Sequence, residues 1–169
     1  MAFNIKNVNS KTNDANRVAN NTSTISNETD DMKQYAIIIN DTNKLDEEQL
    51  KAIKEIYNNK TITTDIINKL ENINTQKKEL YTKYENIDNL PSYFRQQEMS
   101  ALYKKRTELD YEFLNALKSK KLDNETRNKI AQITNESMKL SSDINEILNK
   151  VYEDGNNDIK NMINESIKR

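Results

Sequence analysis

Only one glycine and one proline occur among the 169 residues of the chain. Tight turns depend on these two residues, because glycine adopts positive φ without strain and proline presets φ near the value that a turn needs. Sandwiches, barrels and doubly wound α/β folds contain many such turns. The scarcity of both residues therefore predicts an all-α protein.

The apolar content is low for a chain of this length. About a third of the residues are hydrophobic (34%) and nearly as many are charged (31%). A helix needs only one apolar stripe to pack, whereas a compact mixed fold needs a thicker core. The composition therefore favours an elongated helical bundle.

Composition also excludes several classes of function. The chain has no histidine and no cysteine, so Ser-His-Asp triads, thiol catalysis and the common zinc sites cannot form. The 26 basic and 27 acidic residues nearly cancel, which leaves no overall field to attract nucleic acid or a membrane surface. We therefore expect no enzyme activity, no catalytic, cofactor-binding or metal site, and no small-molecule substrate. No apolar run approaches the roughly 20 residues of a membrane span.

Residues 1–31 read as an extended polar arm, because their few apolar side chains follow no helical or strand period. Ordering such a segment costs about 1 kcal/mol per residue in backbone entropy. Packing on its own small bundle cannot offset that cost, so we expect neighbouring subunits to hold the arm. The apolar residues concerned are Phe3, Ile5, Val8, Val18 and Ile25.

Residues 32–60 are expected to form short helices. Residues 29–40, TDDMKQYAIIIN, carry apolar side chains at helical spacing, although AIII could also form a short strand. A second helix is expected from about Asp46 to Asn58. Asp46 is a good N-cap and Gln49 can complete a capping box, while Leu45 can pack on Leu50.

Residues 61–154 carry three series of positions with the alternating spacing of three and four that is typical of coiled-coil seams. They predict a coiled-coil-like antiparallel bundle in which two long helices form a hairpin around Pro91 and a third packs on them. The alternative to the hairpin is a continuous rod with a kink at Pro91. The first helix should end near Asn89, and the third should begin at Asp123 or Asn124 and end at Gly155. The first seam is Ile66, Leu70, Ile73, Lys77, Leu80, Tyr84 and Ile87; the second is Met99, Leu102, Arg106, Leu109, Phe113 and Ala116; the third is Ile130, Ile133, Ser137, Leu140, Ile144, Ile147 and Val151.

Three seam positions are polar: Lys77, Arg106 and Ser137. The first interpretation is that they lie at an exposed edge, with long side chains extending to water. The alternative is that they fix the register of the helices or mark where another subunit docks.

Residues 155–169 are expected to form a short amphipathic helix through Ile159, Met162, Ile163 and Ile167. The stretch from Asp154 to Glu165 also resembles an EF-hand loop at four ligand positions. Ile159 stands where that loop needs glycine, so we expect no calcium site.

The 27 asparagines, with abundant isoleucine and lysine, indicate an AT-rich genome. Extended arms that thread between subunits are typical of capsid, neck and tail proteins of viruses. The expected function is therefore a structural component of a large assembly, a bacteriophage virion protein whose partners are copies of itself or neighbouring subunits. The alternatives are a helical binding module, which would be cytoplasmic, and a secreted coiled-coil effector.

Overall fold

The computed structural model describes residues 30–168, without the side chains of 159, 160, 162, 163 and 166–168. The polar arm predicted for residues 1–31 therefore lies almost entirely outside the described residues. The described part contains no strand, and the all-α prediction is confirmed by four helices packed against each other. The helices are α2 (Asp30–Asn59), α3 (Thr64–Glu85), α4 (Gln96–Leu117) and α5 (Asn124–Lys168), with the short 3-10 helix η1 (Ser92–Phe94) before α4.

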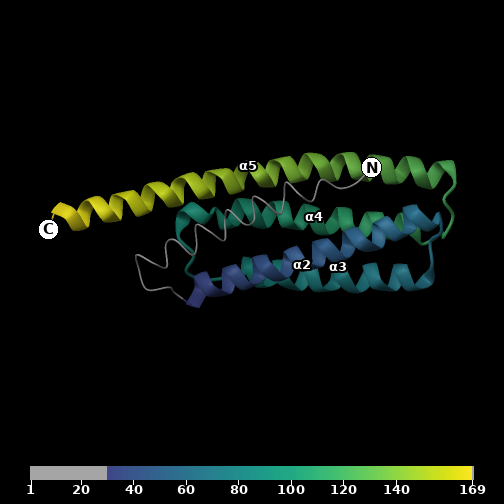
Figure 1. The fold of residues 1–169 in the computed structure, drawn as a ribbon, viewed down its shortest axis with the longest axis horizontal. Coiled ribbons are helices and arrows are strands. Elements are labelled where there is room, and N and C mark those ends of the chain that lie inside the picture. Colours follow the sequence, from purple (N-terminus) through teal and green to yellow (C-terminus); the bar gives the residue numbers. More distant parts are fainter. Residues whose placement is uncertain (1–29, 169) are drawn as a thin grey trace.

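The helices lie along one long axis and pack in chain order, α2 on α3, α3 on α4 and α4 on α5 (Figure 1). The helix α5 is the longest, with 45 residues, and its C-terminal part continues past the ends of the other three (Figure 1). One hydrophobic core draws side chains from all four helices and from η1.

The three heptad series identify the core-facing side of their helices. Every position in them is buried except Leu80, Leu102 and Ile147, which are partly buried and pack against the core. Side chains at this spacing lie on one face of a helix, so a nearly continuous buried stripe is the expected result of packing. Asp123 caps α5 as predicted, because its Oδ1 accepts a hydrogen bond from the backbone N–H of Thr126 at 2.8 Å.

The predicted separate helix from Asp46 to Asn58 is wrong. A single helix, α2, covers residues 30–59, which also decides against the strand alternative for its first part. Asp46 and Gln49 therefore lie in the middle of a helix rather than at an N-terminus. The buried face of α2 runs through this region without a break, because Thr42 and Leu45, each 7% exposed, are buried between Ile39 and Ile53.

The predicted end of the third long helix at Gly155 is also wrong. Gly155 is buried within α5, which continues to Lys168, so residues 155–169 are not a separate short helix. One glycine costs a helix only about 1 kcal/mol relative to alanine. No proline follows, so nothing prevents the helix from continuing. The side chains of the predicted apolar face, Ile159, Met162, Ile163 and Ile167, lie outside those described.

The hairpin region is less regular than predicted. The helix α3 ends at Glu85, four residues before Asn89, and Pro91 precedes η1 instead of starting α4. The joints between helices are made without glycine. Three basic residues hold left-handed backbone conformations there: Lys60 (φ 52°), Arg95 (φ 52°) and Lys120 (φ 56°). This conformation is costly for residues with a Cβ, by about 1 kcal/mol or more.

Candidate functional site: a buried polar cluster and an open groove

The ammonium group of Lys77 is the centre of a polar cluster in the core. Its side chain is 1% exposed, and its Nζ lies 2.8 Å from Oδ2 of Asp110, 2.9 Å from Oδ1 of Asp46 and 3.2 Å from Oε1 of Gln49. An ammonium group has three N–H donors. Three acceptors therefore surround Lys77, and they come from two other helices.

Both carboxylate oxygens of Asp110 accept hydrogen bonds. Its Oδ1 accepts from Nε2 of Gln49 at 3.0 Å, while Oδ2 receives Lys77. The backbone carbonyl of the same residue accepts from Nδ2 of Asn74 at 3.1 Å. Buried charges are stable only when they are paired and hydrogen-bonded. The cluster meets that requirement by joining α2, α3 and α4 at one level of the bundle.

The chemistry of Lys77 is set by these carboxylates. Burial alone would lower its pKa, but the negative charges of Asp110 and Asp46 outweigh that effect and raise the pKa above its ordinary value. A lysine acts as a nucleophile or base only when its pKa is depressed. Lys77 therefore stays protonated near neutral pH and serves as a fixed cation that holds three helices together.

A second link joins α4 to α5. Nη2 of Arg106 donates to Oγ of Ser141 at 2.8 Å, and that hydroxyl donates to the backbone carbonyl of Ser137 at 2.9 Å. Arg106 is 8% exposed and Ser137 is 1% exposed. The prediction that Lys77, Arg106 and Ser137 lie at an exposed edge is therefore wrong. Acceptors on other helices offset the desolvation of the two cations, so both can be buried.

Aromatic side chains fill the end of the bundle near η1. The rings of Tyr81 and Tyr103 stack with centroids 4.4 Å apart, and Tyr84 meets Tyr103 edge-on at 5.2 Å. Tyr35 from α2 lies 6.0 Å from Tyr84 and 4.8 Å from Phe94 of η1. These contacts place the start of α2 at the same end as the end of α3 and the start of α4.

Burial raises the pKa of Tyr35, Tyr81, Tyr84 and Tyr103 above the ordinary value of 10.0. A raised folded-state pKa means that the unfolded chain loses its protons first, so stability is intact below pH 10 and falls as pH rises. The slope is about 1.4 kcal/mol per pH unit for each such phenol. We expect these four tyrosines to ionise only as the helical circular dichroism signal is lost, in a titration followed by phenolate absorbance.

A matched titration in concentrated urea is the control, since all eight tyrosines should then ionise together near pH 10. Ionisation of every tyrosine near pH 10 with the helical signal intact would show that these phenols are open to water. The raised pKa of Lys77 acts in the same direction, because the folded state keeps its proton longer than the unfolded chain does.

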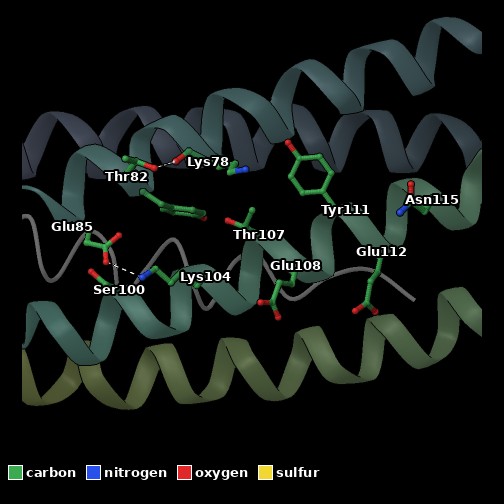
Figure 2. A pocket seen from close by; sticks show the side chains of 11 residues that line it. Lys78, Thr82, Glu85, Ser100, Lys104, Thr107, Glu108, Tyr111, Glu112 and Asn115 are labelled. Carbon is green, nitrogen blue, oxygen red and sulfur yellow. Dashed lines mark hydrogen bonds and ion pairs between the residues drawn. The ribbon is translucent and has the colours of Figure 1, made fainter.

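An open groove of about 570 Å³ lies between α3 and α4, lined by Tyr81 and Tyr111 among others. Figure 2 shows Lys78 on the α3 side of the groove and Thr107 with Tyr111 on the α4 side. No sequence motif marked this groove. Its lining residues have no shared spacing pattern, because two different helices contribute them.

The residues that resembled an EF-hand loop lie within a helix. The helix α5 runs through Asp154–Glu165, where an EF-hand would need a loop, and Asp154 pairs with Nη2 of Arg95 at 3.1 Å. In the part of the chain that the structure describes, no group of three or more Asp and Glu side chains could hold a metal ion.

No family model, curated protein or solved structure matches this chain. Among the described residues, none of the helices has the length and apolar character needed to cross a membrane.

Proposed function

We propose that this protein is a non-enzymatic structural component of a large multi-subunit assembly, a bacteriophage virion protein of the capsid, neck or tail whose N-terminal arm cross-links neighbouring subunits. The observation that carries the proposal is the projection of α5. Arg95, which precedes α4, forms an ion pair with Asp154 of α5. The helix α5 continues beyond Asp154 and past the ends of the other helices (Figure 1). The projecting part of α5 would give this small bundle an additional surface for contacts with neighbouring subunits.

The interior supports a mechanical role. Among the described residues, the buried lysine and arginine, Lys77 and Arg106, are both hydrogen-bonded to side chains of other helices. We also propose that the heptad seams pack as an antiparallel coiled coil, which the burial of nearly all seam positions supports. These hydrogen bonds between helices would limit movement of one helix relative to another, which a subunit held by its neighbours in a particle requires.

The amino-acid composition and the N-terminal arm support a bacteriophage particle as the assembly. Abundant asparagine, isoleucine and lysine point to an AT-rich genome, and an extended polar arm before a small helical bundle is typical of virion subunits that interlock. Coupled ordering of such an arm on a neighbour would supply the cross-link. The protein would then reside in the virion, with other subunits as its partners.

Removal of residues 1–29 tests the role of the arm. Because α2 begins at Asp30 and its buried face begins at Met32, this cut leaves the described core intact. We expect the truncated chain to keep its helical signal and thermal midpoint, and to lose the larger species that the full chain forms with itself or its neighbours in sedimentation velocity experiments.

A chain in which residues 1–29 are shuffled, with their composition kept, is the control for length and charge. It should behave like the truncated chain, because ordering on a neighbour depends on which side chains meet it. Normal assembly by the truncated chain would contradict the proposal.

A helical binding module is the second candidate, and the groove between α3 and α4 favours it. A module of this kind holds one partner peptide or helix in a groove and forms a stable one-to-one complex. Light scattering on the complex with its captured partner separates the two functions, since a virion subunit gives higher-order species instead.

A further inference from the structure

We infer that a small cavity where the four helices meet binds one ordered water molecule, and that this water joins the polar cluster around Lys77 to the link between Arg106 and Ser141. The inference goes beyond the proposed function and does not depend on it, because it concerns how the interior of the bundle is held together.

The cavity has a volume of about 20 Å³. A polar cavity needs about 10–15 Å³ to hold a water molecule, so this one has room for a single water and for little else. Each of the four helices contributes to its wall, through side chains that are buried except for Asp46, which is 14% exposed. They include Thr42 and Asp46 of α2, Tyr81 of α3, Arg106 of α4 and Ile144 of α5.

The hydroxyl of Thr42 is the group in this wall that most needs a ligand. Its Oγ1 is buried, and no group of the described residues forms a hydrogen bond with it. A threonine within a helix can donate to the backbone carbonyl four residues earlier. Thr42 does not, and a buried hydroxyl without a partner is unusual in a folded protein. Four other threonines of these helices do form that bond: Thr75, Thr82, Thr107 and Thr134.

Asp46 and Arg106 add one negative and one positive group to the wall. The carboxylate of Asp46 uses Oδ1 to pair with Lys77, and a carboxylate has several acceptor sites. A guanidinium group has five N–H donors, and the bond to Ser141 uses Nη2 of Arg106. Because the two charges cancel, the cavity favours a neutral molecule that both donates and accepts hydrogen bonds over an ion of either sign. Water is the molecule of that chemistry and size.

A water at this place would connect two sets of interactions that are otherwise separate. The cluster around Lys77 joins α2, α3 and α4, and it includes Asp46. The bond from Arg106 to Ser141 joins α4 to α5. Buried waters typically make about three hydrogen bonds, and Thr42, Asp46 and Arg106 offer that number. The bound water therefore makes one polar network that includes all four helices.

A high-resolution crystal structure of the full chain tests the site directly. We expect one isolated peak of electron density in the cavity, within hydrogen-bond distance of Oγ1 of Thr42 and of a side-chain atom of Asp46 or Arg106. An empty cavity would overturn the inference. So would a Thr42 hydroxyl that donates to the backbone carbonyl of Ile38, since the cavity would then have lost the group that most needs a ligand.

Oxygen-17 magnetic relaxation dispersion tests the same site in solution. It detects water molecules that stay bound for longer than the protein takes to tumble, and proton exchange from hydroxyl groups does not affect the oxygen signal. Thr42→Ile replaces the hydroxyl by a longer apolar group that fills the cavity. We expect the dispersion amplitude of this variant to fall by the equivalent of one water molecule, with the helical circular dichroism signal retained.

The matched control is Thr75→Ile. Thr75 is exposed on α3, and its hydroxyl donates to the carbonyl of Glu71 in its own helix. We expect this variant to keep the amplitude of the parent. An unchanged amplitude in folded Thr42→Ile, or an equal loss in both variants, would contradict the bound water. The crystal structure needs no variant, so it decides the question even if Thr42→Ile does not fold.

Discussion

Replacing Lys77 with methionine will lower the free energy of unfolding by about 3–5 kcal/mol, the usual cost of removing one partner from a buried ion pair. The loss has little to do with the lysine itself. Without its ammonium group, the Asp110 carboxylate stays in the core with only the amide of Gln49 as a side-chain donor. Urea denaturation followed by circular dichroism measures the change.

The adjacent residue provides the control. Lys78 is exposed, so Lys78→Met should change stability by no more than about 0.5 kcal/mol. If the two variants lost the same small amount, water would have to reach the Lys77 ammonium group, and the cluster would not be a closed one.

A double variant separates the ion pair from the packing. Combining Lys77→Met with Asp110→Leu removes both charges, and a buried pair can often be replaced by apolar groups at little cost. We expect the double variant to be more stable than the sum of the two single losses predicts, with a coupling of about 1–3 kcal/mol.

Replacing Phe94 with alanine will cost about 3–5 kcal/mol, the range for removing a large aromatic side chain from a core. Phe94 is 1% exposed, although it belongs to a 3-10 helix of only three residues. Its ring meets Tyr35 of α2 edge-on, and η1 itself packs on α5. Loss of the ring therefore removes the contact by which the connection between α3 and α4 holds the first turns of α2.

Two further substitutions serve as controls for Phe94→Ala, and urea denaturation measures the free energy of unfolding of all three variants. Ser92→Ala changes an exposed position of the same 3-10 helix and should be nearly neutral. Phe94→Leu keeps most of the apolar volume and should lose clearly less than the alanine variant. A loss below about 0.5 kcal/mol for Phe94→Ala would mean that this end of the bundle opens in solution.

Heptad spacing predicted which residues face the core because burial along a helix depends mainly on side-chain period, a local property of the sequence. The same spacing placed Lys77 and Arg106 on the buried face. It could not supply their partners, because Asp46 and Gln49 are about 30 residues from Lys77 along the chain and Asp110 is 33 residues away. When these acceptors are not known, the ammonium group of a lysine in a heptad seam is expected to extend to water.

The misplaced helix start at Asp46 has a related cause. Aspartate and glutamine near the start of an apolar run satisfy free backbone N–H groups at an N-cap, and the same side chains can satisfy a buried cation in mid-helix. Only the position of Lys77 on another helix decides between the two uses. The groove between α3 and α4 was beyond prediction for a different reason, since its shape depends on how two helices pack.

The left-handed joints at Lys60, Arg95 and Lys120 depend on the packing of the helices that they connect. A glycine at a helix end can form its turn early, because the turn is a preferred local state. Here the local preference of each joint opposes the conformation that it holds by about 1 kcal/mol or more. Packing of the helices on either side must offset that cost, so we expect each joint to be only partly populated in a peptide that lacks those helix contacts.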